Sequence, residues 1–164
     1  MADPQALRDL LLYRLSRLAG AAGVPAVRLC EGRYGITRRE WRMLALLAEG
    51  GEMNPSTLAM QAQLDRARTS RALSALVAKG WVRRTVQASD QRYAHVELTD
   101  RGRRLHAQLF PEIAALNREL LSVLSPEAIG ALQAMLDRLQ IQADHLAATC
   151  ALPKAGRQRG RTRS

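Results

Sequence analysis

Positively charged side chains are concentrated in the middle of this chain, and such side chains bind phosphate groups. Residues 66–104 contain ten arginines and lysines against three acidic residues, whereas residues 105–153 contain two arginines against five acidic residues. The whole chain of 164 residues has a formal net charge of +10. Because arginine and lysine displace the counterions of a phosphate backbone, one basic block suits contact with a nucleic acid. From charge alone, a solvated surface that serves solubility is the alternative.

Arginines of this block fall on one side of a predicted helix over residues 66–79. Asp65 is a good N-cap residue, and Gly80 is a good terminator. The inward positions of the helix are Leu73, Leu76, Val77 and either Thr69 or Ser70. The outward positions follow i, i+3, i+4, i+7 spacing and are Arg68, Arg71, Ala72 and Ala75. Small residues beside arginines would let the helix enter a DNA major groove, and ordinary solvated arginines are the alternative.

A β-hairpin with a basic loop is predicted after this helix. Residues 81–86 are rich in β-branched side chains, and residues 94–98 alternate between apolar and polar types. The connecting loop, residues 87–92, contains Asp90 and Arg92. An arginine on such a loop suits a narrow A·T-rich minor groove, where Asp90 would orient it through a charge-assisted hydrogen bond. Alternatively, Asp90 only initiates the turn.

Apolar periodicity and capping residues predict five further helices. The first covers residues 5–22 and either stops near Pro25 or continues to Cys30, before a loop at 31–35. The others are expected at residues 38–50 after a capping box, at 55–61 after Asn54, from Thr99 to about 120, and from Pro126 to about 146.

These elements give a mainly α-helical fold with a small β-hairpin, arranged as a winged helix-turn-helix between N- and C-terminal dimerisation helices. The expected organisation is a dimerisation segment at 1–34, a DNA-binding domain at 35–100, dimerisation helices at 101–150 and a disordered basic tail at 151–164. The outer helices have apolar stripes to bury, so pairing with a second copy is expected. Packing of both stripes within one chain is the alternative. The tail either adds sequence-independent DNA affinity or is a passive solvated end.

The order and spacing of several motifs resemble the MarR family of bacterial transcription regulators. The motifs are Leu64-Asp65-Arg66, Arg71, Leu76, Lys79-Gly80-Trp81-Val82, Arg84, Asp90-Gln91-Arg92 and Leu98-Thr99-Asp100-Arg101-Gly102. The resemblance implies a homodimer that binds double-stranded DNA, and it places the DNA-binding residues on a recognition helix and a wing. The resulting set is Arg66, Arg68, Thr69, Arg71, Arg84, Asp90 and Arg92. Since the family varies at Arg68 and Thr69, no operator sequence is implied.

A small-molecule site is expected where the first, second and fifth helices converge. The residues assigned to it are Tyr13, Arg17, Trp41, Arg42 and Phe110. Regulators similar to this chain bind small aromatic acids in that region, and arginine beside aromatic rings suits a carboxylate on a ring. Trp41 fits the core better than a pocket wall, since cores and pockets are lined by the same residue types.

Composition argues against several other protein classes. No run of about 18 uncharged apolar residues occurs, and the first residues include acids and arginines, so neither a membrane span nor a signal peptide is expected and a cytoplasmic protein is predicted. Cys30 and Cys150 lack metal-ligand spacing and are expected to be reduced thiols. His95, His106 and His145 have no partnered nucleophile, and no glycine-rich phosphate loop occurs. An enzyme, a metal and a cofactor are therefore not expected.

The sequence thus predicts a homodimeric repressor that binds a pseudo-palindromic operator and leaves it when a small ligand binds. The expected ligand is an aromatic carboxylate or its thioester. Two alternatives are an architectural protein that binds DNA without sequence preference and a regulator that senses oxidants through a thiol such as Cys30.

Overall fold

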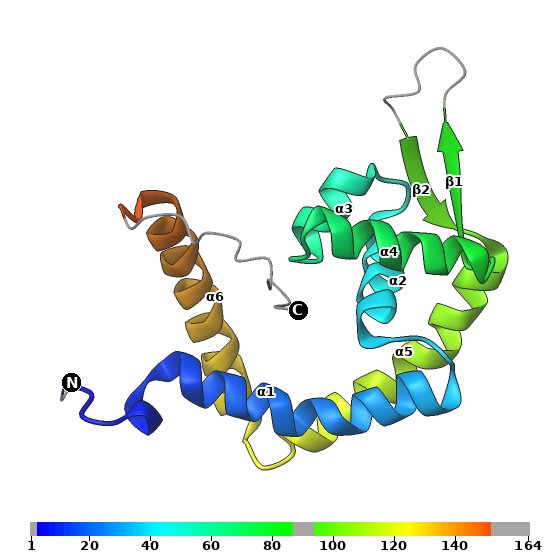
Figure 1. The fold of residues 1–164 in the computed structure, drawn as a ribbon. Helices are drawn as coiled ribbons and strands as arrows, with labels where there is room; N and C mark the ends of the chain where they lie inside the picture. The colour runs from blue at the N-terminus through cyan, green and yellow to red at the C-terminus, as the bar shows by residue number, and fades with distance from the viewer. Residues whose placement is uncertain (1–2, 87–93, 152–164) are drawn as a thin grey trace, which may run out of the picture. The chain divides into compact units, whose positions relative to one another are not determined.

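The computed structural model describes residues 3–86 and 94–151, which are mostly helical with one two-stranded antiparallel sheet (Figure 1). The order of elements is a 3₁₀ turn η1 (Leu7–Asp9), α1 (Leu11–Val27), a π-helix η2 (Arg28–Arg33), α2 (Arg38–Gly50), α3 (Pro55–Gln61), α4 (Arg66–Ala78), β1 (Val82–Val86), β2 (Ala94–Leu98), α5 (Asp100–Leu121) and α6 (Pro126–Thr149). The chain divides into two compact units, residues 1–120 and 121–164, which are described separately.

Side-chain caps set the start of each helix in the helix-turn-helix. The Thr37 hydroxyl accepts from the Glu40 amide at 3.2 Å, and the Glu40 carboxylate accepts from the Thr37 amide at 2.6 Å, so the predicted capping box is confirmed. Asn54 caps α3 by accepting from the Thr57 amide at 2.8 Å. Asp65 caps α4 in the same way, by accepting from the Arg68 amide at 2.8 Å. These bonds satisfy amides that have no partner inside the helix.

The C-terminal ends of α3 and α4 share one geometry. After α4, Gly80 has φ +71°, and the amides of Gly80 and Trp81 donate to the carbonyls of Val77 and Leu76 at 2.9 and 3.0 Å. After α3, Gln63 has φ +53° and donates to the Met60 carbonyl at 3.1 Å. Both ends are Schellman motifs, which need a residue in the left-handed region. Glycine adopts that region without a steric penalty, whereas glutamine does not.

The sheet is a hairpin with a third, single-residue contact. Val82 pairs with Leu98, and the register continues to Val86 opposite Ala94. Met53 bridges to Val96 on the other side of β2 through bonds of 2.9 and 3.1 Å, so β1 is the outer edge. Residues of β2 alternate between buried and half-buried, which confirms the predicted alternation.

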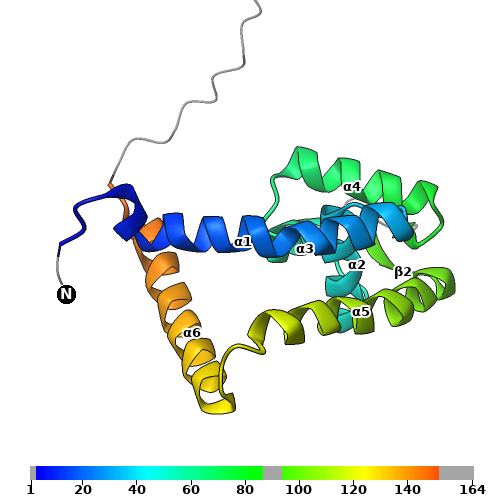
Figure 2. The ribbon, with the colours of Figure 1, turned by 90° about the horizontal axis from the view of Figure 1, so that it is seen from below.

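The core of the first unit lies where α2, α3, α4 and α5 meet the inner face of the sheet, and α2 lies between α4 and α5 in both views (Figure 1 and Figure 2). The side chains with the smallest exposure are aliphatic and include Ile36, Leu44, Leu58, Leu76, Val96 and Leu109. Burying an aliphatic side chain of this size contributes about 1.5–3 kcal/mol. The low aromatic content is consistent with this aliphatic core.

The N-terminal region differs from the sequence prediction. The first α-helix begins at Leu11 rather than at residue 5, because the Asp9 carboxylate accepts from the amides of Gln5 and Ala6 at 3.1 and 2.9 Å and stabilises a 3₁₀ turn instead. It continues through Pro25 to Val27, and a π-helix then extends to Arg33. The loop predicted at 31–35 therefore begins only at Tyr34.

The second unit is built on α6. The Ser125 hydroxyl accepts from the Ala128 amide at 3.3 Å and Pro126 occupies the first turn, as the sequence predicts. No residue of α6 is buried. Its exposed large apolar side chains are Leu132, Met135, Leu136, Leu139, Ile141 and Leu146.

Candidate nucleic-acid interface

The exposed face of α4 carries arginines and small polar residues. Arg66, Arg68 and Arg71 are exposed, and so are Ser70 and Ser74. Within residues 3–86 and 94–151, Arg66 and Arg71 form no ion pair, so their guanidinium groups are available for an external anion. The face therefore combines positive charge with hydroxyl groups and little bulk, which suits close approach to a major groove.

Arg68 is held in a defined orientation by the residue that caps its helix. Its Nε lies 3.4 Å from Oδ2 of Asp65, whose other oxygen accepts from the Arg68 amide. The Arg68 side chain is 55% exposed. A half-exposed pair of this kind contributes little stability, but it restricts the rotamers of the arginine at the first turn of α4.

The inward face of α4 is rotated relative to the prediction. Thr69 is 3% exposed, and its hydroxyl donates to the Asp65 carbonyl at 2.9 Å. Ala72 is also buried, whereas Val77 is 40% exposed. Because its hydroxyl bonds within the helix, Thr69 can occupy an inward position beside Leu73. The expected contact of Thr69 with DNA and the outward position of Ala72 are therefore wrong for this structure.

Ser70 and Ser74 are the residues of this face that sequence reasoning missed. The signal was present, because an inward stripe made of Thr69, Ala72, Leu73 and Leu76 follows helical spacing and leaves both serines outside. Because Val77 is predicted as a core residue, the predicted inward face of α4 is displaced by about one position from the observed one.

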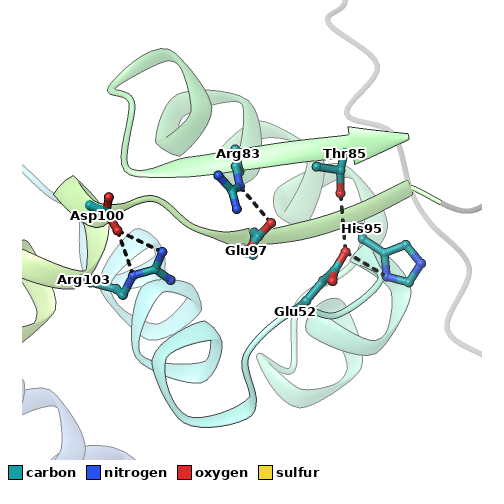
Figure 3. A network of polar contacts seen from close by, with 7 residues as sticks. All are labelled: Glu52, Arg83, Thr85, His95, Glu97, Asp100 and Arg103. Atoms are coloured by element: carbon teal, nitrogen blue, oxygen red, sulfur yellow. Dashed lines mark hydrogen bonds and ion pairs between the residues drawn. The ribbon is translucent and has the colours of Figure 1, made fainter. Parts of the chain in front are cut away.

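The wing strands pair most of their charges with each other. On the solvent side, Arg83 Nε lies 2.8 Å from Glu97 Oε1, and Glu52 accepts from the Thr85 hydroxyl at 3.4 Å while lying 3.8 Å from His95 Nδ1 (Figure 3). The hydrogen bond with Arg83 lowers the pKa of the Glu97 carboxyl, and the same contact raises the pKa of Arg83. The Arg83 guanidinium is therefore paired within the hairpin.

Arg84 is an exposed cation of the described wing strands. It lies opposite Val96 in the register and forms no ion pair within residues 3–86 and 94–151. Its place in the predicted DNA-contact set stays a prediction. Asp90 and Arg92, the predicted wing pair, lie outside the described residues.

A partly buried ion pair joins the start of α2 to the end of α4. Lys79 Nζ donates to both carboxylate oxygens of Glu40 at 3.0 and 3.1 Å and to the Gly35 carbonyl at 2.9 Å. It also lies 5.1 Å from the centre of the Trp81 ring. Burial alone would raise the pKa of Glu40, but the bonds from Thr37 and Lys79 outweigh burial and lower it. The carboxylate is thus ionised and fixes the C-terminal end of α4.

A second junction joins the end of α4 to the start of α5. The Thr99 hydroxyl donates to the Gly80 carbonyl at 2.7 Å and accepts from the Gly102 amide at 3.1 Å, which confirms Thr99 as a capping residue. Gly102 packs directly against the backbone of Trp81, where a Cβ atom would overlap the Trp81 carbonyl oxygen. α4 is therefore anchored at its C-terminal end to two other helices.

The residues predicted to bind a small molecule do not form one site. Tyr13 and Arg17 line a hollow of about 330 Å³ on α1, together with Arg8 and Arg14. A second hollow, which we call the Trp41 hollow, has a volume of about 380 Å³. Its lining includes Arg38, Trp41, Arg42, Glu49 and Ile113. The prediction of a single site is therefore wrong for this structure, because Tyr13 lies about three and a half helical turns before Ala26, the residue of α1 that lines the Trp41 hollow.

Phe110 lines neither hollow and belongs instead to an aromatic stack. Its ring centre is 5.3 Å from that of His106, which stacks on Trp41 at 5.5 Å. His106 Nε2 is buried and has no hydrogen-bond partner among the residues that the structure describes. Burial lowers the pKa of His106, although Glu49 opposes the shift, so the imidazole is neutral at pH 7. Sequence reasoning missed this role, which the i, i+4 spacing from Phe110 could have suggested.

The surroundings of Cys30 do not favour thiol chemistry. Cys30 is fully buried, and burial raises its pKa. A reactive thiolate needs a lowered pKa and access to solvent, so the alternative of Cys30 as a redox sensor is contradicted. Cys150 is exposed. In the described part of the chain, no three His, Cys, Asp or Glu side chains are grouped to hold a metal ion, and no helix is long and apolar enough to span a bilayer.

Comparisons with known proteins give a consistent result. A family model described as MarR family matches residues 34–92. FarR, an HTH-type transcriptional regulator of Neisseria gonorrhoeae, is 32% identical over 104 residues, which cover 63% of this chain and 71% of FarR. A solved transcriptional regulator from Silicibacter pomeroyi superposes with a TM-score of 0.71 at 28% identity and covers 90% of this chain and 94% of its own. NadR, solved in complex with 4-hydroxyphenylacetate, gives a TM-score of 0.69 at 27% identity and covers 84% and 97% of the two chains.

Proposed function

Because the chain belongs to the MarR family of transcription regulators, we propose that it is a cytoplasmic repressor that binds a pseudo-palindromic operator as a homodimer and is released by a small organic acid. In this proposal α4 is the recognition helix. Arg71, Ser70 and Ser74 meet base edges in the major groove, and Arg66 and Arg68 hold the flanking phosphates. The hairpin is the wing.

The observation that carries the proposal is the difference between the two faces of α4. Its inner face is fixed by Leu73 and Leu76 in the core, and its ends are fixed by Asp65 and by the Lys79 junction. Its outer face holds arginines without an ion-pair partner in the described part of the chain. A rigid helix with free cations on one side is what sequence-specific DNA contact requires.

Arg84 supports the wing part of the proposal, since it is the exposed strand cation that Glu97 does not neutralise. In this proposal Arg84 contacts the phosphate backbone beside the recognition helix. The expectation that Asp90 and Arg92 act at the minor groove concerns residues outside the described part of the chain.

Exposed apolar faces support the homodimer. Leucines of α1 and of α6 are exposed, with values that include 54% for Leu18 and 41% for Leu136, and Leu120 near the end of α5 is 44% exposed. Apolar surface on this scale is costly in water and marks a contact with another molecule. A second copy of the chain is the occupant, and a two-fold dimer places two recognition helices about 34–36 Å apart along DNA.

The Trp41 hollow supports an organic acid as the effector. Arg38 and Arg42 supply charge for a carboxylate, while Trp41 and Ile113 supply an apolar wall. NadR, which has a similar fold, was solved with the aromatic carboxylate 4-hydroxyphenylacetate. The effector is accordingly an aromatic carboxylate or its thioester, bound more tightly when the recognition helices are wrongly spaced for DNA.

Footprinting on the home promoter, with three arginine variants, tests the DNA part. We expect a discrete two-fold site for the native protein. Arg71→Ala should weaken binding about ten- to hundredfold and relax the sequence preference, whereas Arg84→Ala should weaken it on all sequences and lower the salt slope by about one. Arg118→Ala, an exposed change near the end of α5, is the control and should leave binding unchanged. Uniform coverage of DNA would instead identify an architectural protein, and no binding at all would refute the proposal.

Calorimetry with a panel of aromatic carboxylates and thioesters, including 4-hydroxyphenylacetate, tests the effector. The effector should bind and release the operator, and Arg38→Gln should weaken its binding. Failure of every compound would remove the effector class while leaving the DNA assignment intact.

A further inference from the structure

We infer that Arg42 couples the Trp41 hollow to the turn that starts the recognition helix, and that a carboxylate in the hollow acts by withdrawing this arginine from the turn. The inference rests on the proposed function for the identity of the hollow. Arg42 and its bond to Ala62 are the link through which a ligand in the Trp41 hollow would affect α4.

The first step is the bond that Arg42 makes. Its Nη1 donates to the Ala62 carbonyl oxygen at 2.9 Å, across 20 positions of the chain. Ala62 is the C-cap of α3 and is fully buried. The last carbonyls of a helix have no partner inside it, so an arginine from α2 satisfies an acceptor that the Schellman motif leaves open.

The second step is the position of that carbonyl. It is followed by Gln63, whose φ of +53° is unfavourable for a side chain, and then by Leu64 and Asp65. Asp65 caps α4 and orients Arg68. Only two residues therefore separate the carbonyl held by Arg42 from the cap of the recognition helix, and one of them is in a conformation that surrounding bonds must maintain.

The third step is competition for the guanidinium. Arg42 lines the Trp41 hollow together with Arg38, whereas the only acid on that lining is Glu49. A carboxylate forms stronger, charge-assisted and often bidentate bonds with arginine than a neutral carbonyl does. A bound carboxylate therefore draws Arg42 from Ala62, the turn loses a restraint, and the cap of α4 is less well ordered. Because the ligand gains only when the bond to Ala62 is broken, its binding and DNA binding oppose each other.

Hydrogen exchange on the full chain tests the restraint without any ligand. Arg42→Met should raise amide exchange over residues 63–68 about tenfold, as expected for loss of one charge-assisted hydrogen bond. Arg38→Met removes the other guanidinium of the same hollow and is the matched control, with exchange in this segment unchanged. Arg42→Lys, which keeps the charge but not the planar donor, should resemble Arg42→Met. Equal exchange in the Arg42 and Arg38 variants would overturn the inference, and melting temperatures will confirm that all variants are folded.

Benzoate and its neutral analogue benzamide test the competition. Benzoate at saturating concentration should raise exchange over residues 63–68 in the native protein, benzamide should not, and benzoate should add nothing in Arg42→Met. An unchanged segment with benzoate, or equal responses of native protein and Arg42→Met, would overturn the coupling. Loss of the two-fold footprint would refute the proposed function instead, without altering either exchange result.

Discussion

We call residues 36–109 the reading head. This region and the helices α1 and α6 differ in how much of their apolar side-chain surface is buried. The reading head contains every buried hydrophobic side chain of the described residues except Cys30. In contrast, α6 has no buried residue, and the one buried residue of α1 is Gly23. The reading head therefore buries its apolar surface within one chain, whereas the outer helices leave theirs exposed.

This difference separates contacts within one chain from contacts that a second copy would supply. In the reading head, caps and buried contacts act between residues of one chain, so its geometry is set before any partner binds. The outer helices carry exposed leucines. In the proposed dimer a second copy of the chain buries them, which contributes about 1.5–3 kcal/mol for each side chain. In the proposed dimer, the spacing of the two reading heads depends on these outer helices.

The largest effect is expected at the tightest contact in the reading head. Gly102→Ala places a methyl group against the Trp81 carbonyl, so we expect a loss of about 3 kcal/mol or more in unfolding free energy, although alanine is the better helix former. Urea unfolding measures it. Gly130→Ala in α6 is the matched control, since apart from adjacent residues and its own helix backbone nothing lies within 4 Å of the added Cβ, and it should be neutral or stabilising. A neutral Gly102→Ala would contradict the junction between α4 and α5.

A charge placed among the exposed leucines of α6 should weaken the proposed dimer. Leu136→Glu places two carboxylates in the symmetric interface of the proposed dimer, so the dimer dissociation constant should rise about a hundredfold, or about 2.7 kcal/mol. Analytical ultracentrifugation measures it. Gln133→Glu adds the same charge on the polar side of α6 and should change little. An unaltered dimer in Leu136→Glu would show that the exposed stripe has another partner.

The pair of the buried Glu40 and the partly exposed Lys79 allows a test by pH. Glu40→Gln should cost about 2 kcal/mol at pH 7, because it weakens the bonds to Lys79 and to the Thr37 amide in a site where Glu40 is 5% exposed. Since the folded-state pKa of Glu40 is lowered, the native advantage is complete above the unfolded value of about 4.3 and is lost as the pH falls through the folded value.

Urea midpoints at pH 7 and pH 3 measure the difference in stability between the native protein and Glu40→Gln. This difference should be smaller at pH 3. Glu49→Gln, an exposed change on the same helix, is the control and should show neither effect. A difference that is constant with pH would mean that the ionised form of Glu40 does not stabilise the fold.

Much of the reading head could be predicted from sequence because its signals are local. Thr37, Asn54 and Asp65 cap helices within three residues of themselves, and alternation alone identified β2. The orientation of α4 was harder to predict, since Thr69 is polar but is buried by a bond to its own helix. Composition cannot distinguish such a threonine from an exposed one.

The candidate small-molecule site could not be predicted because it depends on long-range packing. Trp41 and Arg42 are adjacent to Ile113 only in the folded chain, and the sequence does not specify that Tyr13 is too far along α1 to join them. The bond from Arg42 to Ala62 is equally invisible in the sequence, because any exposed arginine on α2 has the same local pattern.

The smallest expected effect distinguishes the two turns that bound the recognition helix. Both follow a Schellman motif, yet the turn after α4 has Gly80 in the left-handed region and the turn before α4 has Gln63. Gln63→Gly should stabilise the protein by about 0.5 kcal/mol, because relief of the backbone strain exceeds the entropy that glycine adds to the unfolded chain. Gly80→Ala at the equivalent position should destabilise it by about 1 kcal/mol. Urea unfolding of both variants measures the pair. If Gln63→Gly were destabilising, the glutamine side chain itself would hold the turn. The restraint on α4 would then be shared between Gln63 and Arg42 rather than supplied by Arg42 alone.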